Sequence, residues 1–218
     1  MPIKTPTATR TSRGSSRFYD ITHADGTRSS YPSVTTILGA IAKPALVGWA
    51  AKEERTMVSE AAADLHAETA GQQLPRAAYL LALEQRIGTV KAHVKALAKA
   101  GEIGSAAHAK IEWTLKRDLG QRVGAEPVVP EAAEWAVMAF DDWRKAIALK
   151  PLLVEQTVWS RTHAYAGTLD LLATLDPRAL LRVLGNQGPV DLALATWLES
   201  RETATAVIDF KTGKAVYA

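Results

Sequence analysis

The sequence contains no cysteine among its 218 residues. Disulfides, cysteine nucleophiles, thiolate zinc sites and cysteine-ligated iron-sulfur clusters are therefore excluded. The chain also lacks a phosphate-binding P-loop and a Gly-x-Ser-x-Gly motif, which argues against ATP hydrolysis and against serine hydrolase chemistry. We therefore expect neither an iron-sulfur cluster nor a nucleotide cofactor.

Long apolar runs are absent as well. No stretch approaches the roughly 20 residues that a membrane-spanning helix needs, and no hydrophobic region follows the N-terminus as in a secretory signal. With 47% hydrophobic residues, the chain has enough apolar surface for one substantial core. These features predict a soluble globular protein with no membrane partner. The net charge of +3 permits a polyanionic partner without requiring one.

The N-terminal region divides into a basic segment and a compact motif. Residues 1–17 contain no acid and are rich in Ser and Thr, so we expect a flexible basic leader that buries too little apolar surface to order itself. An Asp-Gly turn predicts a β-hairpin over residues 17–31. Ser33 is suited to cap a short helix that ends near Gly39.

Helical patterns occupy the middle of the chain. The periodicity and the prolines predict four helices, over residues 44–70, over residues 75–100, from Gly104 onward and from Pro130 onward. The small residues at 104–107 would let the N-terminus of the third helix approach a phosphate closely. Phe140 and Trp143 of the fourth helix are expected in the core.

After Pro151 the pattern changes to a period of two. Residues 152–159 and 165–175 are predicted to form two strands that pair antiparallel across a short turn. One or two short helices are expected over residues 176–203, followed by a third strand near the C-terminus.

Charged residues interrupt these apolar strands. Asp170 falls in the second strand, and Gly167 before it suggests a close approach to the backbone. Asp209 and Lys211 share one face of the third strand, because side chains alternate along an extended chain. That strand is apolar enough to be central, where charges are rarely kept without pairing or a metal. A surface ion pair at a strand end is the alternative interpretation.

The helix preceding the strands carries His108 and Glu112, four residues apart and therefore on one helical face. Taken alone, this spacing is more typical of a side-chain hydrogen bond than of a metal site. Taken with the strands, the pattern resembles the PD-(D/E)XK nuclease superfamily, and in particular its RecB-type branch, which includes phage exonucleases and the mitochondrial genome maintenance exonuclease. The resemblance rests on three short motifs in the right order, at residues 104–112, 167–170 and 209–211.

The resemblance covers roughly residues 30–218, since the segment around Ser33 also looks like the N-terminal region of the phage members. It implies an α/β fold with a restriction-endonuclease-like core, in which a central mixed β-sheet is flanked by helices. Residues 18–218 would form a single nuclease domain, with the hairpin and a helical wall in residues 18–150 and the catalytic sheet in residues 151–218.

The sequence departs from the branch in two ways. Its members usually continue beyond the lysine strand into a helix with a Gln-x-x-x-Tyr motif, so this chain looks truncated after Ala218. Similar CRISPR-associated and helicase-nuclease enzymes often bind an iron-sulfur cluster, which the absence of cysteine excludes here. The resemblance implies the cytoplasm of a bacterial or phage-infected cell, with the mitochondrion as the alternative.

The chemistry that the resemblance implies is metal-dependent hydrolysis of DNA. The Mg²⁺ or Mn²⁺ ligands would be His108, Asp170, Asp209 and the backbone carbonyl of Phe210, and the nitrogen ligand favours Mn²⁺. Lys211 would orient or deprotonate the attacking water, or stabilise the scissile phosphate. Glu112, and after it Glu155, would bind a second ion or hold a ligand in place, and for both residues a supporting or structural role is favoured over direct ligation.

The expected activity is exonucleolytic, on single-stranded DNA or on DNA ends, in replication, recombination or repair. One alternative is a catalytically inactive DNA-binding module of the same fold. Another is a sequence-specific endonuclease. A third is a non-nucleolytic α/β protein in which Asp209 and Lys211 form an ordinary ion pair.

Overall fold

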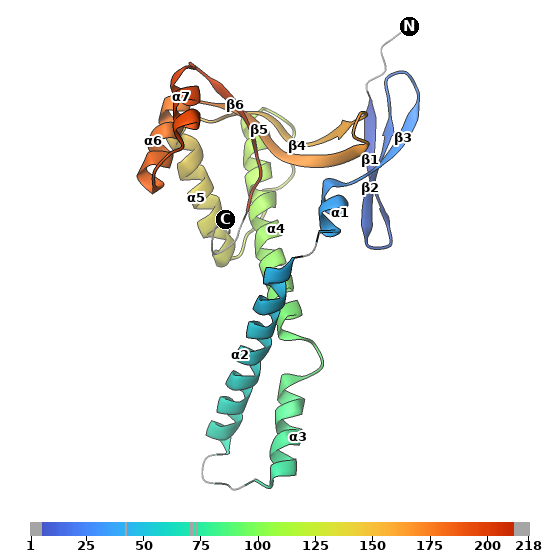
Figure 1. Cartoon of the computed structure of the whole chain (residues 1–218), viewed down its shortest axis with the longest axis vertical. Coiled ribbons are helices and arrows are strands. Elements are labelled where there is room, and N and C mark those ends of the chain that lie inside the picture. Colours follow the sequence, from blue (N-terminus) through green and yellow to red (C-terminus); the bar gives the residue numbers. More distant parts are fainter. Residues whose placement is uncertain (1–5, 42, 70–71, 73, 212–218) are drawn as a thin grey trace. The chain divides into compact units, whose positions relative to one another are not determined.

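The computed structural model describes residues 6–41, 43–69, 72 and 74–211 (Figure 1). The chain divides into two compact units, one comprising Met1–Ile41 and Ile103–Ala218, the other comprising Ala42–Glu102. This division does not coincide with the expected boundary at residue 150. The protein is a mixed α/β protein with two small antiparallel sheets.

The first unit opens with an antiparallel three-stranded sheet of β1 (Thr7–Arg13), β2 (Ser16–Thr22) and β3 (Arg28–Pro32). The predicted hairpin is confirmed, and Gly26 supplies its turn with a φ of 83°.

The predicted flexible leader is wrong for residues 7–17. All seven residues of β1 pair with β2, and Ala8 packs against the cluster of Tyr19 and Ile21. Backbone pairing orders this segment despite its polar composition, because the ladder satisfies the amides and carbonyls that face β2. Residues 1–5 of the expected leader lie outside the described residues.

Helix α1 (Val34–Gly39) begins as predicted at Ser33, whose hydroxyl accepts a hydrogen bond from the Thr36 amide at 3.0 Å. Ser33 also forms an isolated parallel bridge with Ala166. A Cβ built on Gly167 would lie 3.4 Å from Cγ2 of Val34, an ordinary van der Waals contact. The segment that approaches the backbone at Gly167 is therefore this helix.

The second sheet has the order β4 (Lys150–Ser160), β5 (Tyr165–Leu175) and β6 (Ala204–Ile208). All three predicted strands are confirmed, and both pairings are antiparallel. The expected mixed sheet is wrong, because the two described sheets contain antiparallel pairs only.

Among the described strands of this sheet, β5 is central and β6 lies at the edge. The expectation that the strand leading to Asp209 and Lys211 is central is therefore wrong. Strand β6 is short and half solvated, with Val207 69% exposed, as one face of an antiparallel edge strand can be. It ends at Ile208, so Asp209 and Lys211 follow the strand instead of lying within it.

Two helices pack on the second sheet, α4 (Ala92–Asp118) and α5 (Glu131–Ala146). Their core with the sheet contains Ile111, Leu115, Val154, Leu171 and Phe210, and Phe140 packs against it. Trp143 packs on a second cluster, so the core positions predicted for both aromatic residues are confirmed. Helices α6 (Pro177–Gln187) and α7 (Leu192–Glu199) form the predicted helical connection between β5 and β6.

The second unit contains α2 (Pro44–Glu68), α3 (Arg76–Ile87) and the first residues of α4. The predicted helix over residues 75–100 is wrong: it ends at Ile87, where Gly88 has a φ of 71°, and α4 begins at Ala92. Residues 104–107 therefore lie inside α4. They offer no helix N-terminus to a phosphate, because an interior helical amide is already bonded within the helix.

Within the described residues, no helix combines the length and apolar character that crossing a membrane requires.

We predict that Leu171→Ala lowers the free energy of unfolding by about 2–5 kcal/mol, because it opens a cavity in the core beneath α4. Urea denaturation followed by circular dichroism measures the change. Leu172→Ala is the matched control, since its half-buried side chain should cost clearly less. Equal losses in the two variants would contradict this assignment of the core.

Candidate metal centre

The main chain of Phe210 joins three elements of the first unit. Its amide donates a hydrogen bond to Oδ2 of Asp170 on β5 at 2.7 Å, and its carbonyl accepts one from Nε2 of His108 on α4 at 2.9 Å. Because a carbonyl can only accept, Nε2 carries the proton, and in the neutral ring Nδ1 keeps a lone pair. Nδ1 lies 3.8 Å from Oδ2 of Asp170. Three of the predicted ligand positions are thus brought together.

The side chain of Phe210 anchors this arrangement in the core. It is buried, and its ring packs edge-on against the rings of Phe140 and His108, with centroid distances of 5.0 and 5.4 Å. The chain after β6 therefore has a fixed position. That position places the Phe210 amide and carbonyl against groups from two other elements.

Glu155 on β4 is the third acidic or imidazole side chain of the cluster. Val154 pairs with Leu171 and Gln156 with Leu169, so Glu155 lies opposite Asp170 on the neighbouring strand. His108, Glu155 and Asp170 each offer one ligand atom, and these atoms lie within 4.8 Å of one another. The backbone of Glu155 has a φ of 50°, a left-handed conformation that is uncommon for a residue with a side chain.

The charge around Glu155 is predominantly negative. Burial, followed by the negative charges of Glu112 and Asp170, raises the pKa of the Glu155 carboxyl above its ordinary value, while Lys116 and His108 oppose that shift. Such a shift shows that the surroundings disfavour a charged carboxylate. A divalent cation bound there would reverse this preference.

Glu112, predicted to be catalytic, lies next to this cluster with its side chain already paired. Its carboxylate forms an ion pair with Lys116 one helical turn along α4, at 2.5 Å. A supporting role through charge is compatible with this pairing, because Glu112 still acts electrostatically on Glu155. Its participation in catalysis stays a prediction.

Asp209 and Lys211 lie directly after β6 and form an ion pair with each other. Their side chains are 61% and 79% exposed. Among the residues that the structure describes, Asp209 is not part of the cluster with His108 and Asp170. The arrangement is that of a surface ion pair, and the roles predicted for both residues in catalysis and metal binding stay predictions.

The donor set suits a hard divalent cation. It combines an imidazole nitrogen, two carboxylates and a main-chain carbonyl, the mixture that Mn²⁺ accepts and that Mg²⁺ binds through its oxygens. One ligand atom from each of the three side chains lies within 4.8 Å of the others, so His108, Glu155 and Asp170 are the described residues that would hold such an ion.

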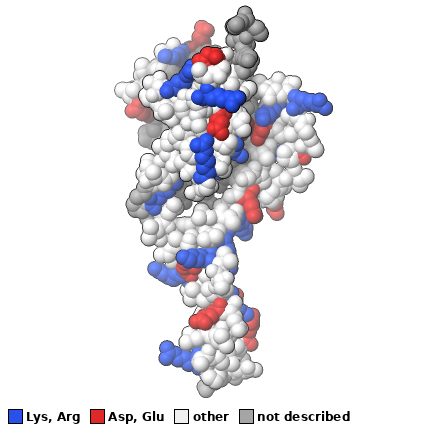
Figure 2. Space-filling view, turned by 90° about the vertical axis from the view of Figure 1, so that its right-hand side faces the viewer, with Lys and Arg blue, Asp and Glu red and all other residues white. Residues whose placement is uncertain are grey.

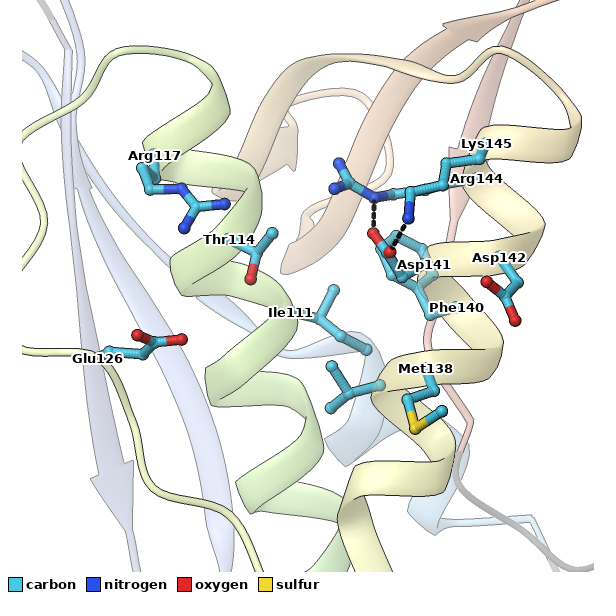
Figure 3. A pocket seen from close by; sticks show the side chains of 11 residues that line it. Ile111, Thr114, Arg117, Glu126, Met138, Phe140, Asp141, Asp142, Arg144 and Lys145 are labelled. Carbon is cyan, nitrogen blue, oxygen red and sulfur yellow. Dashed lines mark hydrogen bonds and ion pairs between the residues drawn. The ribbon is translucent and has the colours of Figure 1, made fainter.

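Two cavities of the first unit differ in character. The cavity between α4 and α5 has a volume of about 450 Å³, and most of the charges in its lining are paired. Figure 3 shows Asp141 bonded to both Arg144 and Lys145, at 2.7 and 2.5 Å. No member of the cluster of His108, Glu155 and Asp170 is among its described lining residues.

The larger groove, of about 710 Å³, adjoins the candidate centre. Asp209, Phe210 and Lys211 line it together with Trp135 and Phe140 of α5. The groove therefore extends to the ion pair of Asp209 with Lys211 and to Phe210, whose main chain bonds to His108 and Asp170.

Comparison with known proteins gives no match: no protein-family model, no curated protein and no solved structure corresponds to this chain. The resemblance to PD-(D/E)XK nucleases therefore stays a prediction from short motifs.

We predict that in the metal-free protein Glu155 titrates above the ordinary glutamate range. A folded-state pKa above the unfolded value means that the associated stability is present at low pH and is lost as pH rises through the raised pKa. Carbon-13 NMR of the side-chain carboxyl groups measures the titration. Glu155→Gln should abolish the associated pH dependence of unfolding.

Glu126 provides an internal reference in the same spectra, because the hydrogen bond from Lys110 lowers its pKa below the ordinary value. The pKa of Glu155 should therefore lie above that of an ordinary glutamate, and the pKa of Glu126 below it. A pKa of Glu155 equal to or lower than that of Glu126 would contradict the prediction.

Proposed function

We propose that the protein is a metal-dependent DNA nuclease, acting as an exonuclease on single-stranded DNA or on DNA ends. The observation that carries the proposal is the apposition of His108 and Asp170, from a helix and a strand, with the main chain of Phe210 between them. The sequence motifs support it in part, because His108, Asp170 and the main chain of Phe210, one from each motif, also lie together in the fold.

The proposed metal ligands are His108 through Nδ1, the carboxylates of Asp170 and Asp209, and the carbonyl of Phe210. Mg²⁺ or Mn²⁺ bound there would supply a nucleophilic water near neutral pH and neutralise charge on the phosphate. For Asp209 to contribute, its side chain would turn away from Lys211. The high exposure of both side chains leaves room for that rotation.

Lys211 has two ways to assist. Its side chain is 79% exposed and lines the larger groove, so a phosphate entering there would meet its ammonium group without displacing core residues. There it would stabilise charge on the scissile phosphate, or hold the attacking water by a hydrogen bond. Either role requires the ion pair with Asp209 to open.

Binding of DNA would depend on local contacts more than on a large basic surface. On the face shown in Figure 2, Lys and Arg side chains are interspersed with Asp and Glu side chains, and the net charge is only +3. Affinity should therefore be modest and salt-dependent, as expected when few phosphates are neutralised.

A second candidate is a non-catalytic DNA-binding module of the same fold. The observation that favours it is the pairing of Asp209 with Lys211 outside the cluster of His108 and Asp170. If that pair persists when DNA and cations are present, the chain would bind without turnover.

We predict that end-labelled linear DNA is cleaved with Mg²⁺ or Mn²⁺ and is intact with EDTA, while circular DNA is spared. Asp170→Asn and Lys211→Met should each lower the rate by at least about 100-fold, because one removes a proposed ligand and the other a charge at the phosphate. Gel electrophoresis of single- and double-stranded substrates measures the rates.

Glu126→Gln is the matched control, since it removes one exposed acid that pairs with Lys110 away from the site. It should cleave like the wild type. DNA binding without cleavage in every metal would support the second candidate, while cleaved circles would indicate an endonuclease. Cleavage that survives Asp170→Asn would contradict the proposed site.

A further inference from the structure

We propose that Glu155 is a direct ligand of the divalent cation, in addition to His108 and Asp170. The proposal rests on the proposed function only in requiring a cation at the same centre. It concerns a residue that lies outside the three sequence motifs, and it is testable without DNA.

The strand register is the first argument. Glu155 lies opposite Asp170 because the pairs on either side of it, Val154 with Leu171 and Gln156 with Leu169, fix the alignment of β4 and β5. Glu155 itself departs from regular strand geometry, with a φ of 50°, but an oxygen of its carboxylate lies within 4.8 Å of an oxygen of Asp170. Like charges in that position repel, so a cation between the two carboxylates would turn repulsion into attraction.

The distances are the second argument. One ligand atom each from His108, Glu155 and Asp170 falls within a common span of 4.8 Å, and the three residues come from three different elements, α4, β4 and β5. Asp209, which the motifs favoured, is absent from this described cluster. Glu155 therefore fills the position of a second carboxylate ligand as the structure stands.

The cationic side chains around Glu155 already have other partners. Lys116 forms an ion pair with Glu112 at 2.5 Å, and the His108 ring donates a hydrogen bond to the Phe210 carbonyl and faces Asp170. Among the described residues, Glu155 has no ion-pair partner of its own. Its carboxylate is therefore available to a bound ion.

The backbone conformation of Glu155 is one that glycine adopts more readily than glutamate. At a φ of 50°, Glu155 occupies a region that glycine adopts freely and other residues adopt at a cost. Replacing Glu155 by glycine should relieve that strain as well as the carboxylate repulsion. The metal-free protein should then lose no stability, although a ligand has been removed.

The test is a titration with Mn²⁺ by isothermal calorimetry, together with thermal unfolding with and without Mn²⁺. Glu155→Gln should weaken Mn²⁺ binding at least about tenfold and reduce the Mn²⁺-induced rise in Tm, because the ligand atom is replaced by a poorer donor. Glu155→Gly should do the same while its metal-free Tm equals or exceeds that of the wild type. Glu155→Asp keeps the carboxylate and should recover part of the affinity.

Glu126→Gln is again the control for the loss of one negative charge, and it should bind Mn²⁺ like the wild type. Unchanged Mn²⁺ affinity in folded Glu155→Gln, or a wild type that binds no Mn²⁺, would overturn the proposal. If Mn²⁺ binding depends on Glu155 but no DNA is cleaved, this proposal holds and the proposed nuclease function is refuted. If DNA is cleaved but Glu155→Gln binds Mn²⁺ as tightly as the wild type, the nuclease function holds and this proposal is refuted.

Discussion

The two main-chain hydrogen bonds of Phe210 are the constraint on which the candidate centre depends. They attach the end of β6 to Asp170 on one side and to His108 on the other. The buried ring of Phe210, packed against Phe140, fixes the position from which these bonds are made. Helix α4, strand β5 and the chain after β6 therefore meet at Phe210. The imidazole of His108 and the carboxylate of Asp170 are brought together at the same point.

Negative charge collects at this meeting point without an equal positive charge. Asp170 and Glu155 oppose each other across two strands, and Glu112 lies close enough to raise the pKa of Glu155. Lys116 forms its ion pair with Glu112 and only partly offsets the negative charge at Glu155. Uncompensated carboxylates in a half-buried position destabilise a fold unless a cation binds them, which is the physical basis of the proposed metal centre.

Periodicity and capping predicted most of the elements, including the helix that Ser33 caps and the strands on both sides of the turn before Tyr165. They failed where order comes from long-range contacts. Strand β1 is ordered by its pairing with β2, which composition does not reveal, and α4 begins at Ala92 because Gly88 interrupts the preceding helix. At the site, motif spacing found His108 and Asp170, but it ranked Asp209 above Glu155, because strand register is not visible in spacing.

Anomalous diffraction from crystals grown with Mn²⁺ would test the proposed metal centre without reference to activity, because the signal locates the ion itself. We expect one anomalous peak within bonding distance, about 2.1–2.3 Å, of Asp170, His108 and Glu155. Manganese bound elsewhere, or no peak at saturating Mn²⁺, would contradict it, and His108 and Asp170 would then be a hydrogen-bonded network that holds the end of β6 in place.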